Sequence, residues 1–219
     1  MSMKWSGMSL IVLFNASVYA NFSEKNLNTL YEFVSGFSVD AKEYKAIEDQ
    51  GGDPLYGEIT FQGLEKLLKE LKPGAHDVFY DLGCGVGKVC VQLLFTTPIL
   101  KCVGIELSST RIGHAQKTLR HLELQKKIPQ NKQLRFLNEN IKDANISDGT
   151  IFYLGCYGDE VMKVALENLS KIHHRIRFAT IRKTIGHPEF RLIKTVSVPM
   201  TWSENVPVYI YEKRTKNTI

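Results

Sequence analysis

The chain of 219 residues has few features of metal-binding, disulfide-stabilised or membrane-spanning proteins. Its four cysteines form no Cys-X-X-Cys pair, and no histidine lies near them at metal-ligand spacing, so a metal site is not expected. Three of the cysteines lie in apolar stretches, where cysteine behaves as a small hydrophobe, and this favours a reducing compartment. No apolar run reaches the ~20 residues of a membrane-spanning helix, which excludes an integral membrane protein.

Internal repeats, low-complexity tracts and an obvious linker are absent as well, and the 43% of apolar residues suffice for one core of ordinary size. The formal charge of +5 would suit an acidic partner such as nucleic acid or a chromatin surface. Lysine and arginine are spread over the whole length, however, apart from a short basic end at Lys213, Arg214 and Lys216. Such a spread usually only solvates a surface. We expect a compact monomer whose weak basic character permits nucleic-acid contact.

The first twenty residues allow two interpretations. Lys4 precedes an apolar run over residues 9–14, and residues 18–20 resemble a signal-peptidase site, as in a secretory signal peptide. The run is short and is broken by Asn15 and Ser17, which suits an amphipathic helix packed on the domain equally well. The sequence leaves both interpretations open.

Apolar side chains at helical spacing mark residues 21–72 as a small helical N-terminal lobe. They comprise Leu27, Leu30, Tyr31 and Val34 before a loop over residues 50–58, and Phe61, Leu64, Leu67 and Leu68 after it. The loop is too rich in Gly and Pro to be regular.

From residue 73 to residue 219 the pattern changes to short apolar runs that alternate with helical stretches. Strands are expected at residues 77–82, 102–106, 134–137, 150–154, 177–185, 190–198 and 206–211, and helices at 88–96, 108–126 and 160–169. This alternation predicts an α/β fold with a mostly parallel sheet that is covered on both faces. The last three strands leave no room for a crossover helix, so an antiparallel edge is expected.

The most informative motif is the DLGCGVG run from Asp81 to Gly87, which follows a strand and opens a helix. Gly83 and Gly85 would let the backbone turn tightly beside a ligand, and Gly87 would let the helix pack close to the strand. Glu106, at the end of the next strand, could accept both hydroxyls of a ribose. A glycine-rich turn without a ligand is the simpler alternative.

The acidic residue inside this motif bears on the choice of ligand. Asp81 would repel a pyrophosphate but attract the α-ammonium of a nucleoside that carries an amino acid. The glycine spacing is also one residue tighter than the dinucleotide fingerprint. Both observations favour S-adenosylmethionine over NAD.

Three motifs together resemble a known family. LYGEIT at residues 55–60, DLGCGVGK at 81–88 and TWSENVPVY at 201–209 are similar, in this order, to the disruptor-of-telomeric-silencing type of histone lysine methyltransferase, which has no SET domain. The similarity covers roughly residues 51–213. It implies a Rossmann-like methyltransferase sheet, mostly parallel with an antiparallel edge, that binds S-adenosyl-L-methionine and methylates a protein lysine, possible targets including histones and nucleosomes.

The resemblance also implies roles for individual residues. The YGE loop would cover the methionine end of the cofactor, the glycine motif would form its floor, Glu106 would hold the ribose, and residues 140 and 141 would meet the adenine. The cofactor-binding residues would be Tyr56, Gly57, Glu58, Asp81, Gly83, Gly85, Gly87, Lys88, Glu106, Asn140 and Ile141. Trp202 and Tyr209 would wall the lysine channel, and Tyr157 would join them in removing water from the lysine amine. The simpler alternatives are core packing for the aromatic residues and a surface turn for the YGE loop.

The chain departs from the family at several positions. Residues 154–157 read LGCY where the family has Asn-Asn-Phe, Ile59 replaces Thr, and Gly51 stands where the family has an aromatic residue. The long basic extension is absent. These departures leave open another protein or a small amine as the methyl acceptor, and a non-catalytic nucleoside-binding module is a further alternative. An NAD-dependent oxidoreductase is disfavoured. Localisation stays open with the N-terminus: the protein is cytoplasmic, or it is exported by one cell and acts inside another, as a bacterial effector reaching host chromatin would.

Overall fold

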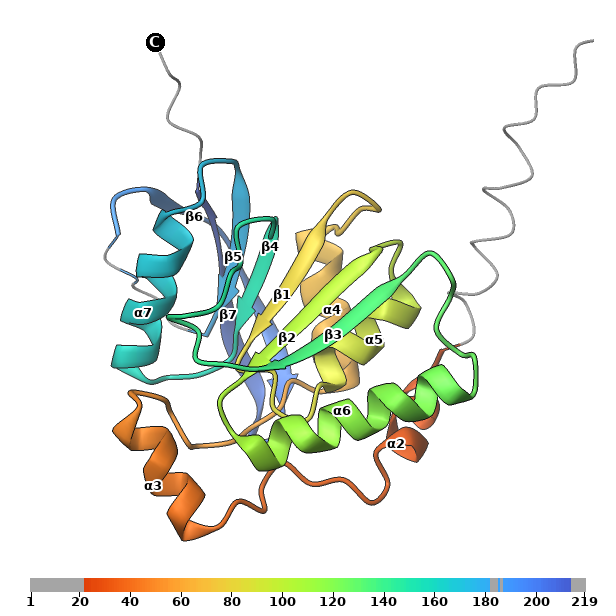
Figure 1. The fold of residues 1–219 in the computed structure, drawn as a ribbon. Coiled ribbons are helices and arrows are strands. Elements are labelled where there is room, and N and C mark those ends of the chain that lie inside the picture. Colours follow the sequence, from red (N-terminus) through yellow and green to blue (C-terminus); the bar gives the residue numbers. More distant parts are fainter. Residues whose placement is uncertain (1–21, 182–184, 186, 214–219) are drawn as a thin grey trace, which may run out of the picture.

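The computed structural model describes residues 22–181, 185 and 187–213. The segment expected to be a signal peptide or helix and the basic residues Arg214 and Lys216 lie outside this range. The elements follow in the order α2 (Glu24–Leu30), α3 (Ala41–Asp49), α4 (Phe61–Leu71), β1 (Val78–Leu82), α5 (Lys88–Thr96), β2 (Lys101–Glu106), α6 (Ser109–Leu124), β3 (Gln133–Asn138), β4 (Ile151–Leu154), α7 (Asp159–Ser170), β5 (Ile176–Thr180), β6 (Phe190–Met200) and β7 (Ser203–Lys213) (Figure 1). None of the helices in the described ranges is long and apolar enough to cross a membrane.

The strands form one sheet of seven in the order β3-β2-β1-β4-β5-β7-β6. Neighbouring strands from β3 to β5 are parallel, whereas β7 is antiparallel to both β5 and β6. This arrangement confirms the expected α/β fold with a mostly parallel sheet and an antiparallel edge. The strand order reverses between β1 and β4, and such a switch point leaves a crevice at the carboxyl ends of the strands where ligands bind in open α/β sheets.

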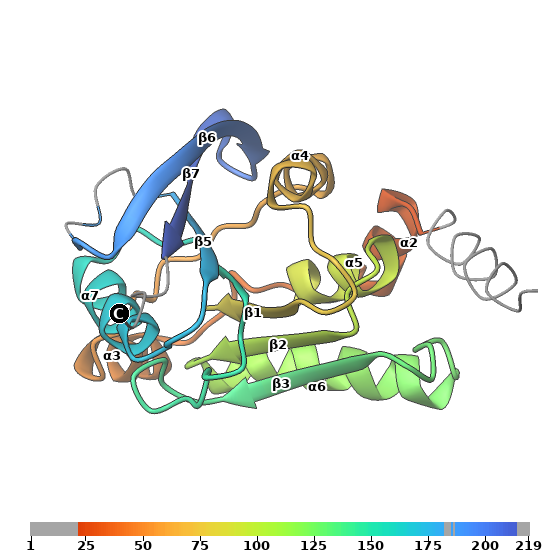
Figure 2. The same cartoon turned by 90° about the horizontal axis from the view of Figure 1, so that it is seen from above.

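Both faces of the central sheet are covered, which explains why the central strand β4 is apolar and buried at every position. Phe79 and Tyr153 point into a core formed with α4, α5 and α6, while Tyr80 and Phe152 point into a second core formed with α7. Figure 2 shows α7 on one side of the sheet and α4 and α5 on the other. Phe79, Phe152 and Phe178 are fully buried.

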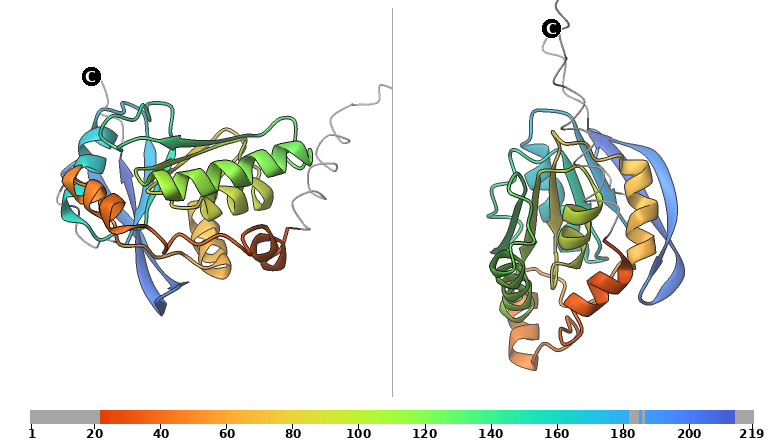
Figure 3. Two further views of the ribbon diagram at one scale, coloured as in Figure 1. Left: turned by 60° about the horizontal axis from the view of Figure 1, so that its bottom comes forward. Right: turned by 90° about the vertical axis from the view of Figure 1, so that its right-hand side faces the viewer.

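The N-terminal segment differs in part from the helical pattern of the sequence. Helix α2 ends at Leu30, so Tyr31 and Val34 follow it instead of continuing it. Helix α3 buries only Ile47, and a single apolar contact leaves little periodicity to detect. Helix α4 has the expected apolar face and packs on β6, beside the β6–β7 hairpin (Figure 3). The division of the chain into domains remains a prediction.

One strand is shorter than expected: β5 ends at Thr180, whereas the sequence suggested a strand to residue 185. Thr180 pairs with Leu154 of β4 and with Tyr209 of β7. Residues 182–184 of the predicted strand lie outside the described residues.

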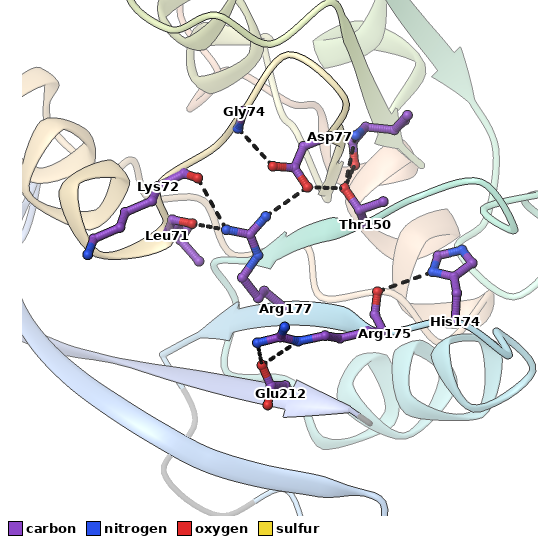
Figure 4. Close-up of polar contacts among 10 residues, drawn as sticks. Leu71, Lys72, Gly74, Asp77, Thr150, His174, Arg175, Arg177 and Glu212 are labelled. Atoms are coloured by element: carbon purple, nitrogen blue, oxygen red, sulfur yellow. Dashed lines mark hydrogen bonds and ion pairs between the residues drawn. The ribbon is translucent and has the colours of Figure 1, made fainter. Parts of the chain in front are cut away.

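A polar network lies at the starts of the strands, at the opposite end of the sheet from the glycine motif (Figure 4). The Asp77 carboxylate accepts hydrogen bonds from the Gly74 amide at 2.8 Å, the Arg177 guanidinium at 2.7 Å and the Thr150 hydroxyl at 2.7 Å. Arg177 also donates to the Leu71 carbonyl at the end of α4. Burial alone would raise the pKa of Asp77, but these hydrogen bonds lower it. The network fastens α4 to β1, β4 and β5.

Candidate functional site

The loop between β1 and α5 has a backbone that strongly favours glycine. Gly83, Gly85 and Gly87 have φ values of +86°, +55° and +87°, in the left-handed region that L-side chains rarely adopt. The Gly83 amide donates to the Ile105 carbonyl at 2.8 Å, which ties the loop to the end of β2.

Each of these glycines has different surroundings. A Cβ at Gly87 would lie 2.5 Å from Phe136 Cζ, so its absence lets α5 approach β3. A Cβ at Gly85 would lie 2.4 Å from the Tyr56 ring. At Gly83 no described atom lies within 4 Å of that position, so the space beside its backbone is free.

Glu106, at the end of β2, is buried and held in a fixed orientation. Its two carboxylate oxygens accept hydrogen bonds from the Gly85 and Ser108 amides, each at 2.8 Å. Burial raises the pKa of Glu106, and the amide hydrogen bonds oppose that rise. The carboxylate therefore joins the glycine loop to the start of α6.

Asp81, at the end of β1, is 2% exposed and has no ion-pair partner among the described residues. Burial and the nearby charge of Glu106 raise the pKa of Asp81 to about 8. A buried carboxylate without a cationic partner is costly. Such a group is a characteristic mark of a ligand site.

The YGE loop covers the glycine motif and is linked to it by charge. The Tyr56 hydroxyl donates to Glu58 Oε1 at 2.7 Å, and Lys88 Nζ lies 2.7 Å from Glu58 Oε2. The Arg111 guanidinium lies over the Tyr56 ring at 4.7 Å from its centroid. Burial and the neighbouring Glu58 charge raise the pKa of Tyr56, so the phenol stays protonated.

The turn of the β6–β7 hairpin brings Trp202 to this loop. The Thr201 amide donates to the Glu58 carbonyl at 2.8 Å, and the Glu58 amide donates to the Thr201 hydroxyl at 3.0 Å. A Cβ at Gly57 would lie only 2.2 Å from Trp202 Cζ3, so the indole packs directly on Gly57. The LYGEIT and TWSENVPVY motifs, which lie far apart in the sequence, therefore meet here.

Two adjoining cavities lie at this end of the sheet. The larger is a cleft of about 760 Å³, open solvent included, and its lining includes the expected residues Tyr56, Gly57, Gly83, Glu106, Asn140 and Ile141. The smaller, of about 420 Å³, is lined by the expected residues Tyr56, Gly57, Glu58, Asp81, Gly83, Lys88 and Trp202, together with Ile59, Val89, Tyr153 and Gly155. Tyr56, Gly57, Gly83 and Gly155 line both, so the two cavities meet beside these four residues.

Not every expected residue reaches the cavities. In the described part of the chain, Tyr157, which is 51% exposed, and Tyr209, on β7, line neither of them. The side chain of Asn140 is engaged at the rim, where its amide donates to the Gln50 carbonyl and its oxygen accepts from the Lys142 amide. The roles suggested for Tyr157, Tyr209 and Asn140 remain predictions.

Two polar residues that sequence reasoning missed hold the cover of the larger cavity. Buried Arg111 donates to the carbonyls of Gly36 at 2.9 Å and Pro54 at 2.7 Å. Glu43 on α3 accepts from the Ser108 hydroxyl at 2.8 Å and the Thr110 amide at 2.9 Å. Burial would raise the pKa of Glu43, but hydrogen bonds at the start of α6 lower it to about 2.

The only sequence signal for these contacts was weak. A carboxylate that faces the start of a helix is a known stabilising arrangement. Because 65 residues separate Glu43 from Ser108, no local sequence pattern links the two. The described residues contain no group of three or more His, Cys, Asp or Glu side chains that could hold a metal ion.

Comparison with known proteins identifies relatives of the chain. Residues 31–128 match the family model described as histone methylation protein DOT1. The chain is 27% identical over 138 residues to an H3 lysine-79 specific histone-lysine N-methyltransferase of Caenorhabditis elegans, covering 58% of this chain and 15% of that protein. The corresponding Drosophila melanogaster protein is 35% identical over 63 residues, or 29% of this chain and 3% of that one. A protein-lysine N-methyltransferase of Saccharolobus islandicus is 27% identical over 115 residues, or 52% of this chain and 68% of that one.

The fold has solved counterparts. The magnesium protoporphyrin IX methyltransferase of Synechocystis PCC 6803 with bound SAM superposes with a TM-score of 0.52 at 16% identity, over 90% of this chain and 99% of that one. The chain spans only a small part of the two animal enzymes. The family match and the fold confirm the resemblance expected from the sequence: residues 31–128 are similar to the DOT1 family of histone methylation proteins, and the chain has the fold of a solved methyltransferase.

Proposed function

We propose that this protein transfers a methyl group from S-adenosylmethionine to the side-chain amine of a protein lysine. The observation that carries the proposal is the pair of buried carboxylates, Asp81 and Glu106, on either side of the glycine loop. Asp81 lines the smaller cavity and Glu106 the larger one, so a ligand with two different polar ends would span both. The similarity to named lysine methyltransferases supports the same proposal.

The residues present fit this cofactor. Asp81 offers a negative charge to an α-ammonium, which would repay the cost of its burial. Glu106 offers two fixed oxygens to ribose hydroxyls, and the free space beside Gly83 admits the chain between these ends. Asn140 and Ile141 line the larger cavity, and we expect them to meet the adenine. When bound, S-adenosylmethionine supplies a methyl group activated by a positively charged sulfur.

The chain's own task is to hold the acceptor amine in line and to keep water away. Trp202, packed on Gly57, presents an aromatic surface at the smaller cavity. An apolar wall disfavours a charged ammonium and so helps a lysine give its proton to solvent, after which the nitrogen lone pair is free to attack. Glu58 is already bonded to Tyr56 and Lys88, which suits orientation of the cover better than proton abstraction.

The finer proposal is that the lysine belongs to a histone, since two relatives carry that specificity in their names. A lysine of another protein is the second candidate. It is favoured by Gly155 and Cys156, which stand at the cavities where the family has Asn-Asn-Phe. It is also favoured by the similarity to the archaeal protein-lysine N-methyltransferase.

Calorimetric titration with S-adenosylmethionine tests the cofactor, using wild type, an Asp81→Ala, Glu106→Ala double variant, and Glu65→Ala as a control carboxylate on the exposed face of α4. We expect binding by the wild type and the control and none by the double variant. A labelled-methyl assay on core histones, nucleosomes and total lysate then tests the acceptor. Label on another lysate protein alone would exclude the histone, and no binding by the wild type would exclude the cofactor.

A further inference from the structure

Tyr153 on β4 is a buried residue whose hydroxyl oxygen is not enclosed by protein atoms and makes no hydrogen bond to the described residues. The residue is 4% exposed and lines the smaller cavity, so the hydroxyl can be reached by a ligand there. Burial, and secondarily the charge of Asp81 on the neighbouring strand, raise the pKa of Tyr153 and keep the phenol neutral. Polar atoms of largely buried residues nearly always have a partner, so an unpaired hydroxyl that opens onto a cavity points to a ligand there.

The position of this hydroxyl is fixed by a nearby glycine. A Cβ at Gly155 would lie 2.8 Å from Tyr153 Oη, so the hydroxyl fills the space that a side chain at position 155 would need. Gly155 lines both cavities. Tyr153 Oη therefore lies where the two cavities meet.

On the proposed function, this meeting point is where the methyl group is transferred. A ligand with its ammonium near Asp81 and its ribose near Glu106 has its reactive centre between these ends, because the sulfur separates the amino-acid chain from the nucleoside. Tyr153 is the buried side chain there whose polar atom is uncommitted, since Tyr56 already donates to Glu58.

We propose that the Tyr153 hydroxyl binds the acceptor nitrogen by accepting a hydrogen bond from one of its N–H groups. This proposal rests on the proposed function. The bond turns the nitrogen lone pair toward the methyl group. As the C–N bond forms, the electrons of the C–S bond pass to sulfur, and the methylated nitrogen then loses its extra proton to water. A fully methylated nitrogen has no N–H, so the hydroxyl favours an acceptor that still carries hydrogen over the final product.

The test compares wild type, Tyr153→Phe and Tyr80→Phe, each saturated with S-adenosylhomocysteine. Tyr80 is a matched control because its hydroxyl is bonded to Asp148 on the other face of the sheet, away from the cavities. The probes are n-butylammonium, which has the N–H groups of a lysine side chain, and n-butyltrimethylammonium, which has none. Their binding is followed by NMR titration, and the affinity for S-adenosylhomocysteine is measured separately by calorimetry.

We expect Tyr153→Phe to bind n-butylammonium about tenfold more weakly than wild type, because an N–H group loses its partner in a desolvated site. Binding of n-butyltrimethylammonium and of S-adenosylhomocysteine should change less than about twofold, and Tyr80→Phe should match wild type for all three.

Other outcomes overturn the proposal in distinguishable ways. Equal affinity of Tyr153→Phe and wild type for n-butylammonium, or equal losses for both probes, would show that the hydroxyl accepts no N–H bond. A selective loss of S-adenosylhomocysteine affinity would assign the hydroxyl to the cofactor instead. If wild type binds S-adenosylhomocysteine but not n-butylammonium, the amine site is excluded and the proposed cofactor site is retained. Wild type that does not bind S-adenosylhomocysteine removes the proposed function as well.

Discussion

Replacing Asp81 by Asn should stabilise the free protein at neutral pH, and the gain should grow as pH rises. The folded protein holds this carboxyl protonated up to a pKa of about 8, whereas the unfolded chain releases the proton above its ordinary pKa of 3.8. A group whose pKa is raised by folding contributes stability below pH 3.8 that is lost as pH rises toward 8. Asn is neutral in both states and contributes no such dependence.

The size of the effect follows from the width of this window. Each pH unit between the two pKa values shifts the free energy of unfolding by about 1.4 kcal/mol. Between pH 5 and pH 7, the stability of wild type should therefore fall by about 3 kcal/mol relative to Asp81→Asn. Glu106 is present in both proteins, so its own titration contributes to both.

Urea unfolding at pH 5, 6, 7 and 8 measures this difference directly. Asp143→Asn, which removes an exposed carboxylate, serves as the control and should show no trend of this kind against wild type. If the free-energy difference between wild type and Asp81→Asn is the same at all four pH values, the account of a strained, ligand-seeking carboxylate is refuted.

Three further predictions concern the same loop and the far end of the sheet. S-adenosylmethionine should displace about one proton from Asp81 at pH 7, because its ammonium favours the charged carboxylate. Calorimetry in buffers with different ionisation enthalpies should then give different apparent binding enthalpies. Identical binding enthalpies in all buffers would contradict the prediction. Gly87→Ala should lower the free energy of unfolding in urea by about 3 kcal/mol, because the added Cβ combines a positive φ with a clash on Phe136. A decrease of less than about 1 kcal/mol would count against this account. Asp77→Ala should cost about 2 kcal/mol, because it removes the carboxylate to which Arg177, Gly74 and Thr150 donate, yet it should leave cofactor affinity unchanged. A changed affinity would argue that the two ends of the sheet are coupled.

The sequence was most informative where structure depends on neighbours in the chain. Helix α5 has the predicted bounds because a glycine turn opens it and apolar residues continue to its end. The strand before it and Glu106 at the end of β2 were also predicted, since alternating short apolar runs and helical stretches leave few topologies open.

The remaining parts of the site depend on contacts between distant residues. Neither α3 nor the role of Glu43 could be predicted, because one buried isoleucine gives no periodicity and the partners lie on another helix. Arg111 looked like an ordinary helix residue until its backbone partners were placed. The uncommitted hydroxyl of Tyr153 depends on a glycine two residues away, and its meaning emerges only when both cavities are known.

The way in which α3 is attached affects how fast a ligand can leave the larger cavity. The segment around α3 buries little apolar surface, but Glu43 binds the start of α6, Gln50 accepts from Asn140, and Asp53 accepts from the Gly158 amide at 3.0 Å. Hydrogen bonds can be exchanged for water one at a time, so this segment can lift while the sheet stays folded. Ligand departure and local opening then become the same event, and the residence time of a bound nucleoside is governed by these attachments together with the Arg111 bonds to the Gly36 and Pro54 carbonyls.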